Sequence, residues 1–365
     1  MTANPRSTIR RAENPIIDQK VVPARRRRAP AVAFFLLAAA GLPVSIVAAS
    51  LFGSADIGFL DVVSTILRHV GLGGIAPTPP LPKLLDALIW ESRFPRVLLA
   101  AVVGTALAVS GAVLQAITRN PLADPYLLGV SSGASTGAVA VLLLGIGGGI
   151  SLSTGAFAGG LVAFGLLLVL LGGGRVASPT RVVLTGVLVS QFFAAVTSLI
   201  LMVSGDANST RGFTYWLLGT LAGARWEGVT VTIVIVLVGV LAIQFFAPAL
   251  DAVTFGWDSA TALGINVTAA RVWLMVLTAL ITAAAVAASG AIGFIGLLVP
   301  HAVRILVSPM HRSLLPLSAI TGAILLIWVD TFARTAFTPH ELPAGVITAL
   351  LGAPAFALVL KRLES

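Results

Sequence analysis

Few side chains in this sequence are of the types that carry out chemistry, and they are widely spaced. The 365 residues include no cysteine, and the four histidines do not have the spacing of metal ligands. None of the lysines is followed by Ser or Thr, as the nucleotide-binding P-loop requires. No nucleophile, base and acid converge in a pattern typical of catalysis. The sequence therefore predicts that the chain is not an enzyme and that it binds neither a metal nor ATP itself.

Ionisable residues are also rare within the long apolar runs. Asp330, near the end of one run, is the exception, and the other acidic residues fall between the runs or in the tails. An ion-coupled carrier needs ionisable groups inside the membrane, and many channels need rings of charge. The pattern favours a permease driven by a separate ATPase. The alternative is a stand-alone secondary transporter or channel for a small solute.

The elements that must position these residues are membrane helices. Apolar residues make up 57% of the chain and charged residues only 10%, whereas about 25% of a soluble domain is charged. The apolar residues lie in long uncharged runs, and a helix needs about 20 such residues to cross the hydrocarbon layer. The sequence therefore predicts an all-α, polytopic membrane protein.

The runs predict about ten transmembrane helices within one domain, residues 29–362. Two long runs hold two helices each: one is divided near Gly147–Gly149, and the other after Ser289–Ala291, where the second helix is short. Gly133 and Gly137 have the spacing that lets neighbouring helices pack closely. The expected segments are 29–55, 97–118, 125–174 (two helices), 182–205, 228–250, 272–303 (two helices), 313–329 and 342–360.

The basic residues predict the orientation of these helices. Residues 1–28 contain eight Lys and Arg and directly precede the first apolar run, which is typical of a basic tail retained in the cytoplasm. An arm that binds nucleic acid is the less favoured interpretation of Arg25–Arg28. With this tail inside, sixteen Lys and Arg lie on the cytoplasmic side and seven outside. We therefore expect a cell-membrane protein with both termini cytoplasmic, in which the Pro-rich stretch Gly73–Pro82 is a non-helical external loop.

Two segments between the helices are candidates for binding a partner. In the longest cytoplasmic connection, residues 251–271, Asp258 and Gly264 fit the start and the end of a short helix. That helix could enter a groove of a partner, or the segment could be a solvated connector. On the external side, Arg93 and Arg96 offer donors on one helix face, either to carboxylates of a partner or to lipid headgroups.

Six segments, in this order, resemble one family: the iron-chelate and cobalamin importer permeases, which are FecCD-type membrane subunits of binding-protein-dependent ABC importers. Each segment alone is a string of common residues, but the six at these separations are specific. Residues 1–28 and 73–86 lie outside the resemblance. The matching segments are Arg93–Arg96, Ser110–Gln115, Asn120–Gly133, Gly290–His301, His311–Pro316 and Glu341–Pro354.

The resemblance implies a type II ABC importer permease fold, with ten helices per protomer and two protomers around a central pathway. It also implies two ATPase subunits, which bind ATP and Mg, and an extracytoplasmic substrate-binding protein. The cargo expected from the breadth of the family is a ferric siderophore first, with haem or cobalamin as further possibilities. The implied mechanism is ATP-driven alternating access, with the second protomer either identical or a close paralogue.

The same resemblance implies roles for particular residues. Those that dock the binding protein would be Arg93, Arg96 and Arg334. Those that couple to the ATPase would be Asp258, Leu263 and Gly264. Those that form the cytoplasmic gate would be Ser178, Pro179 and Thr180, with a second constriction at Asn120 and Leu122. Pro179 departs from the family pattern, because related permeases can have a hydroxyl residue there.

Overall fold

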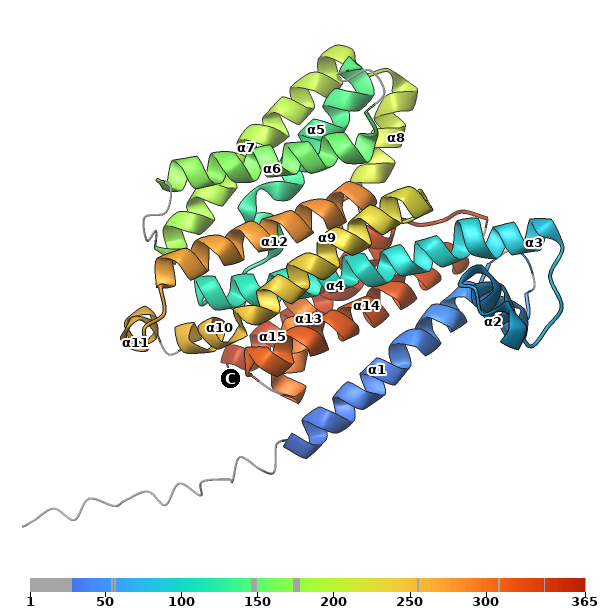
Figure 1. The fold of residues 1–365 in the computed structure, drawn as a ribbon. Coiled ribbons are helices and arrows are strands. Elements are labelled where there is room, and N and C mark those ends of the chain that lie inside the picture. Colours follow the sequence, from blue (N-terminus) through green and yellow to red (C-terminus); the bar gives the residue numbers. More distant parts are fainter. Residues whose placement is uncertain are drawn as a thin grey trace, which may run out of the picture.

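The computed structural model describes residues 28–364, except for 54, 56, 146–149, 173–177, 255, 308 and 338. All regular elements within these residues are helical, and they form one bundle (Figure 1). Apart from Arg28, the predicted basic tail lies outside the described residues.

Within the described residues, ten helices make up the bundle, as the apolar runs predict. Seven helical stretches are long and apolar enough to cross a membrane, while α5, α13 and α15 are shorter apolar helices. The ten helices are α1 (Arg28–Leu51), α4 (Phe94–Thr118), α5 (Val130–Leu144), α6 (Leu152–Leu171), α7 (Pro179–Ser204), α9 (Trp226–Phe245), α12 (Val267–Ser289), α13 (Ile295–Leu306), α14 (His311–Thr335) and α15 (Ala344–Glu364).

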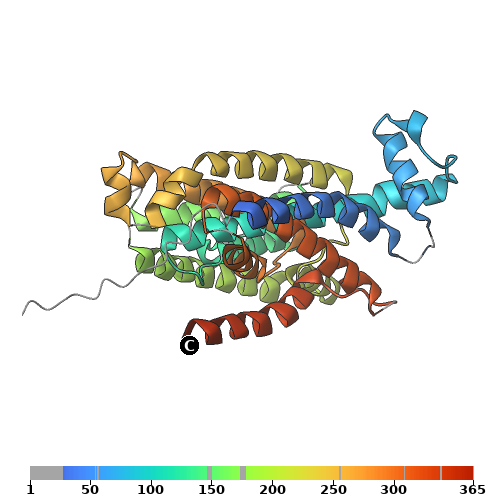
Figure 2. The same cartoon turned by 90° about the horizontal axis from the view of Figure 1, so that it is seen from below.

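Shorter elements cap the two ends of the bundle. Figure 1 shows α2 and α3 at one end, called here the α2 end, and α10 and α11 at the opposite end, called the α11 end. In Figure 2, the α2 region projects beyond the other helices. The shorter elements are α2 (Phe59–His69), α3 (Lys83–Ala87), α8 (Ala207–Leu217), α10 (Ala247–Thr254), α11 (Trp257–Ala262), the 3₁₀ turns η2 (Gly73–Ile75) and η4 (Pro125–Leu128), and the π-helical segment η3 (Leu88–Arg93).

Several predicted boundaries differ from the structure; α14, for example, ends at Thr335 rather than at Val329. The helix expected over 97–118 begins at Lys83, because α3, η3 and α4 are continuous over 36 residues. At 1.5 Å per residue this stretch is about 54 Å long, more than the roughly 30 Å apolar layer, so its charged first turns extend beyond that layer. The expected run 228–250 ends at Phe245, where Pro248 cannot continue the hydrogen-bond ladder. The predicted loop Gly73–Pro82 begins with one 3₁₀ turn.

Helix α4 lies at the centre of the bundle and packs closely against its neighbours. Most of its residues are buried, from Pro95 to Thr118. A side chain at Gly111 would collide with the backbone of Gly296 on α13, so glycine at this position lets the two helices touch. Gly137 is in equally close contact with Gly155 of α6, which confirms the predicted role of small residues in packing.

The break between α12 and α13 follows Ser289, as the sequence predicts. Gly290 has φ +69°, and the backbone stays unwound until Ile295. The hydroxyl of Tyr126 donates to the carbonyl of Ile292 (2.9 Å) and accepts from its N–H (2.7 Å). Buried backbone groups need such partners, so Tyr126 allows the helix to be interrupted inside the bundle.

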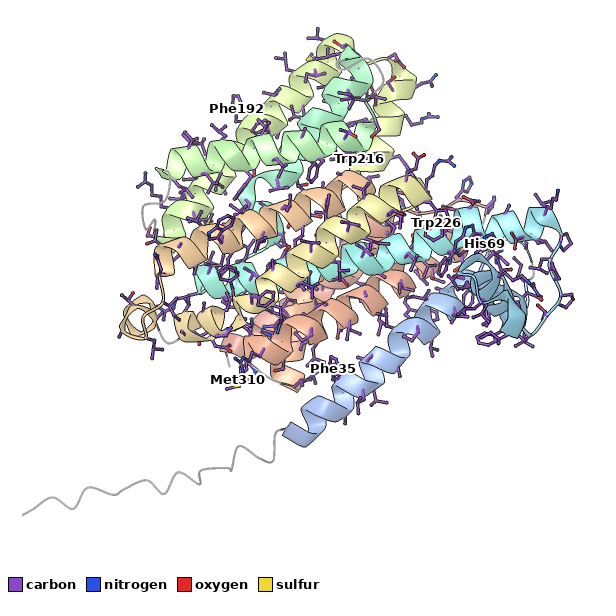
Figure 3. The ribbon with its side chains drawn as sticks, viewed as in Figure 1. Phe35, His69, Phe192, Trp216, Trp226 and Met310 are labelled. Atoms are coloured by element: carbon purple, nitrogen blue, oxygen red, sulfur yellow. The ribbon has the colours of Figure 1, made fainter. Side chains whose placement is uncertain are left out.

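The outer faces of several helices carry exposed apolar side chains. On α7 these include Leu188, Phe192 and Met202, and α1 contributes Phe35. Figure 3 shows Phe35 and Phe192 on the outside of the bundle. A chain with this much apolar surface requires an apolar environment around it, as a multi-pass membrane protein has.

Candidate functional site

Two of the three arginines predicted to dock a partner hold the last turn of α1. Arg93 ends η3, and Arg334 lies in the last turn of α14. The final carbonyls of a helix have no partner within it, and these guanidinium groups supply one. As a result only 4% of Arg93 is exposed, and 7% of the Arg334 side chain. The hydrogen bonds are 2.5–3.2 Å long, and the accepting carbonyls are those of Ala49, Ser50, Leu51, Phe52 and Ala55.

The third arginine, Arg96, joins two carboxylates. Its Nε lies 2.9 Å from Oδ2 of Asp330, and its Nη2 lies 3.0 Å from Oδ1 of the same group. Its Nη1 donates to Oε2 of Glu341 at 2.8 Å. The Asp330 side chain is only 2% exposed, whereas that of Glu341 is 44% exposed. Arg96 is therefore anchored inside the bundle by one carboxylate and reaches the surface through the other.

An aromatic cluster lies beside these arginines. The ring of His69 stacks on Trp90 with centroids 4.3 Å apart, and Trp90 lies 4.7 Å from Trp226 on α9. The indole N–H of Trp226 donates to the carbonyl of Trp90 (2.7 Å). Figure 3 shows His69 and Trp226 close together at the α2 end. The cluster ties α2 and η3 to α9 and so positions the start of α4.

The predicted coupling segment lies at the α11 end and is mostly helical. Residues 251–271 include the end of α10, all of α11 and the start of α12. After α11, Gly264 has φ +79°, and the N–H groups of Gly264 and Ile265 donate to the carbonyls of Thr261 and Ala260. This is the Schellman ending that the Gly264 position predicts. Leu263 is 73% exposed, and the side chain of Asp258 lies outside the described residues.

A carboxylate on α10 fastens this segment to α14. Oδ1 of Asp251 accepts hydrogen bonds from the backbone N–H of His311 (2.7 Å) and from its Nδ1 (2.8 Å). The first N–H groups of a helix have no partner within it, and a negative charge is favourable there. Asp251 therefore caps α14, whose other end carries Asp330 and Arg334.

The predicted gate residues Ser178, Pro179 and Thr180 form the start of α7. Oγ of Ser178 accepts from the N–H of Arg181 (3.3 Å), as an N-cap does. Pro179 occupies the first helical position, where its missing N–H costs nothing and its fixed φ suits a helix. Its departure from the family pattern therefore has a local structural reason.

The second predicted constriction follows α4 at the same end of the bundle. Oδ1 of Asn120 accepts from the N–H of Leu122 (2.9 Å), and the Leu122 side chain is 43% exposed. Asp124 caps η4 through the N–H of Tyr126. Burial raises the pKa of Asp124 to about 6, although this hydrogen bond lowers it. Among the described residues, no hydrogen bond joins Asn120 or Leu122 to the start of α7.

Three acidic partners were not predicted as site residues: Asp251, Asp330 and Glu341. Asp330 and Arg334 are four residues apart, the spacing of neighbours on one helix face, so the sequence held a signal for that pair. Asp251 and Glu341 left no such signal, because their partners are on distant segments. In the part of the chain that the structure describes, no three His, Asp or Glu side chains gather as metal ligands.

Comparisons with known proteins identify the family of this chain. Residues 41–362 match the FecCD transport family. The chain is 43% identical over 285 residues to the cobalamin import system permease protein BtuC of Halobacterium salinarum, covering 78% of this chain and 76% of that protein. It is 40% identical over 301 residues to the Fe(3+) dicitrate transport system permease protein FecD of Escherichia coli K12, covering 80% and 93%. A solved structure described as an inward-facing ABC transporter of metal-chelate type matches with TM-score 0.77 and 28% identity, covering 92% of this chain and 99% of that one.

Proposed function

Since the chain belongs to the FecCD transport family of ABC-transporter permease subunits, we propose that it moves an iron chelate into the cell by ATP-driven alternating access. The observation that carries the proposal is the family match over 41–362 in a ten-helix membrane bundle. The cargo class favoured is a ferric siderophore, with haem or cobalamin as further candidates. The names of two relatives, a cobalamin and a ferric dicitrate permease, support a bulky metal chelate.

The proposed complex places different partners at the two ends of the bundle. Two ATPase subunits would bind at the α11 end, where Leu263 and Gly264 form an exposed turn beside Asp258. A substrate-binding protein would dock at the α2 end, and both termini would lie on the ATPase side. A second permease protomer, identical or a close paralogue, would complete the pathway.

Docking at the α2 end would use Arg96, Arg93 and Arg334 in different ways. Arg93 and Arg334 would act by fixing the end of α1, because they donate to the carbonyls of Leu51 and Ala49. Arg96 would contact the partner directly, because its Nη1 donates to the exposed carboxylate of Glu341. A carboxylate of the binding protein would take that position.

Helix α14 supports a mechanical link between the two ends. Its N-terminus is bonded to Asp251 of α10, and its last turns carry Asp330 and Arg334. A packed helix moves as a unit, so a shift of α10 and α11 on ATP binding would reach the α2 end. Ser178–Thr180 and Asn120 with Leu122 would then open or close the pathway at the α11 end.

The test is transport by purified components in liposomes. The permease with its ATPase and binding protein is expected to accumulate a ferric siderophore only when ATP is supplied. Haem and cobalamin, offered in parallel, identify the cargo if the siderophore is not taken up. Uphill uptake by the permease without any ATPase would contradict the proposal and favour a secondary transporter.

A further inference from the structure

A basic cavity lies at the α11 end, separate from the predicted coupling turn. Its volume is about 280 Å³, and it lies between the C-terminal ends of α4 and α13 and the N-terminus of α14. Arg119, Arg304 and His311 line it, together with Gln115 and Thr254. No Asp or Glu is among its lining residues within the described chain.

Within the described part of the chain, no carboxylate pairs with either of the two arginines of this cavity. Nη1 of Arg304 donates to Oε1 of Gln115 (3.1 Å), which is a neutral acceptor. The Gln115 amide is fixed in this direction because its Nε2 donates to the carbonyl of Gly296 (3.1 Å). The side chain of Arg119 is exposed and makes no hydrogen bond or ion pair with any described residue. The cavity therefore presents uncompensated positive charge.

His311 adds a buried nitrogen without a partner. The residue is only 2% exposed, and its Nδ1 is bonded to Asp251. Its Nε2 is buried and has no hydrogen-bond partner among the described residues. A buried polar atom left unpaired is unfavourable and is rare in folded proteins. An oxyanion in the cavity would accept hydrogen bonds from the guanidinium groups of Arg119 and Arg304.

We propose that this cavity binds a carboxylate side chain of the ATPase, as a contact additional to the turn at Leu263 and Gly264. The inference rests on the proposed function, because the partner is the ATPase of the importer. Thr254 of the lining belongs to α10, directly before the predicted coupling helix, so the cavity opens on the same end of the bundle. Uncompensated arginines favour a partner of opposite charge.

The position of Arg119 gives this contact a consequence for transport. Arg119 ends α4 in the left-handed conformation, with φ +49°, and is followed at once by Asn120 of the predicted constriction. A carboxylate held by Arg119 would connect the ATPase to the gate segment without passing through α11. The phosphate of an anionic lipid could satisfy the same donors, but the contact with α10 favours the ATPase.

The experiment compares charge reversals on one surface. Arg119→Glu changes a side chain with no internal partner, and Arg312→Glu is the matched control, because Arg312 is exposed on the first turn of α14 and does not line the cavity. Binding of the purified ATPase to the permease in nanodiscs of zwitterionic lipid is measured by biolayer interferometry. We expect about a tenfold or greater loss of affinity for Arg119→Glu and less than about twofold for Arg312→Glu.

A compensating charge reversal on the ATPase provides the second measurement. Single Asp or Glu to Lys substitutions on the ATPase are screened for one that restores binding to Arg119→Glu while weakening binding to the unsubstituted permease. Equal effects of Arg119→Glu and Arg312→Glu would overturn the proposal while leaving the ATPase partnership intact. An effect of Arg119→Glu seen only in nanodiscs with anionic lipid would assign the cavity to a lipid instead. Failure of the unsubstituted permease to bind the ATPase would remove the proposed function as well.

Discussion

Arg96 and Asp330 are 234 residues apart in the chain and form a bidentate ion pair. Nε of the arginine lies 2.9 Å from Oδ2 of the carboxylate, and Nη2 lies 3.0 Å from Oδ1. The pair joins the start of α4 to the end of α14, and its carboxylate is almost completely buried. Arg334 approaches the same carboxylate, with its Nε 3.9 Å from Oδ2. The buried Asp330 carboxylate thus lies against two arginines at the α2 end.

Removing the buried negative charge of Asp330 should lower the stability of the folded protein. In Asp330→Asn, Arg96 loses its buried ionic partner and keeps only the exposed Glu341, and breaking a buried pair in this way typically costs about 3–5 kcal/mol. We expect a clear fall in the apparent melting temperature in detergent. Glu341→Gln is the control, because exposed pairs contribute at most about 1 kcal/mol, and equal shifts for the two variants would contradict the assignment.

Glu341 should compete with the binding protein for Arg96. Its exposed carboxylate accepts from Nη1 of Arg96, so Glu341→Gln should raise the affinity of the permease for its binding protein by about tenfold or less. Arg96→Gln should lower that affinity. Both affinities are measured by interferometry with the permease in nanodiscs. A lower affinity for Glu341→Gln would show that this carboxylate assists docking.

The turn after α11 should be sensitive to the backbone conformation of Gly264. A β-branched residue with φ near +79° is strained by about 1–2 kcal/mol, although a Cβ added here would meet no other atom within 4 Å. We expect Gly264→Val to reduce stimulation of the ATPase by the permease while the melting temperature of the bundle changes little. Gly228→Val, in a similarly open position on α9, is the control. Normal ATPase stimulation and assembly in Gly264→Val would exclude a coupling role for this turn.

The stability of the protein should depend on the protonation of Asp124. Burial raises its folded pKa to about 6, above the value near 4 expected in the unfolded chain. The folded state therefore binds the proton more tightly, and this contribution to stability is lost as the pH rises from about 4 through 6. Asp124→Asn keeps the cap on Tyr126 without the charge. Its melting temperature relative to the original protein should rise between pH 4.5 and 7.5, and a constant difference would argue against the shift.

Much of the bundle was predictable because membrane helices obey a local rule. A run of uncharged residues long enough to cross the hydrocarbon must be helical, since its backbone groups find no water there. The break after Ser289, the ending at Gly264 and the small residues Gly133 and Gly137 were also indicated by nearby residues in the sequence. These features, and the resemblance to the family, were determined by the sequence alone.

The partners of the charged residues were decided only by the tertiary structure. Arg93 and Arg96 are three residues apart, yet one satisfies carbonyls of α1 and the other binds Asp330 and Glu341. Asp251 likewise accepts a hydrogen bond from His311 only because α10 packs against α14. Ion pairs and hydrogen bonds depend on distances of about 3 Å between atoms, and such distances between remote segments arise only when the helices pack.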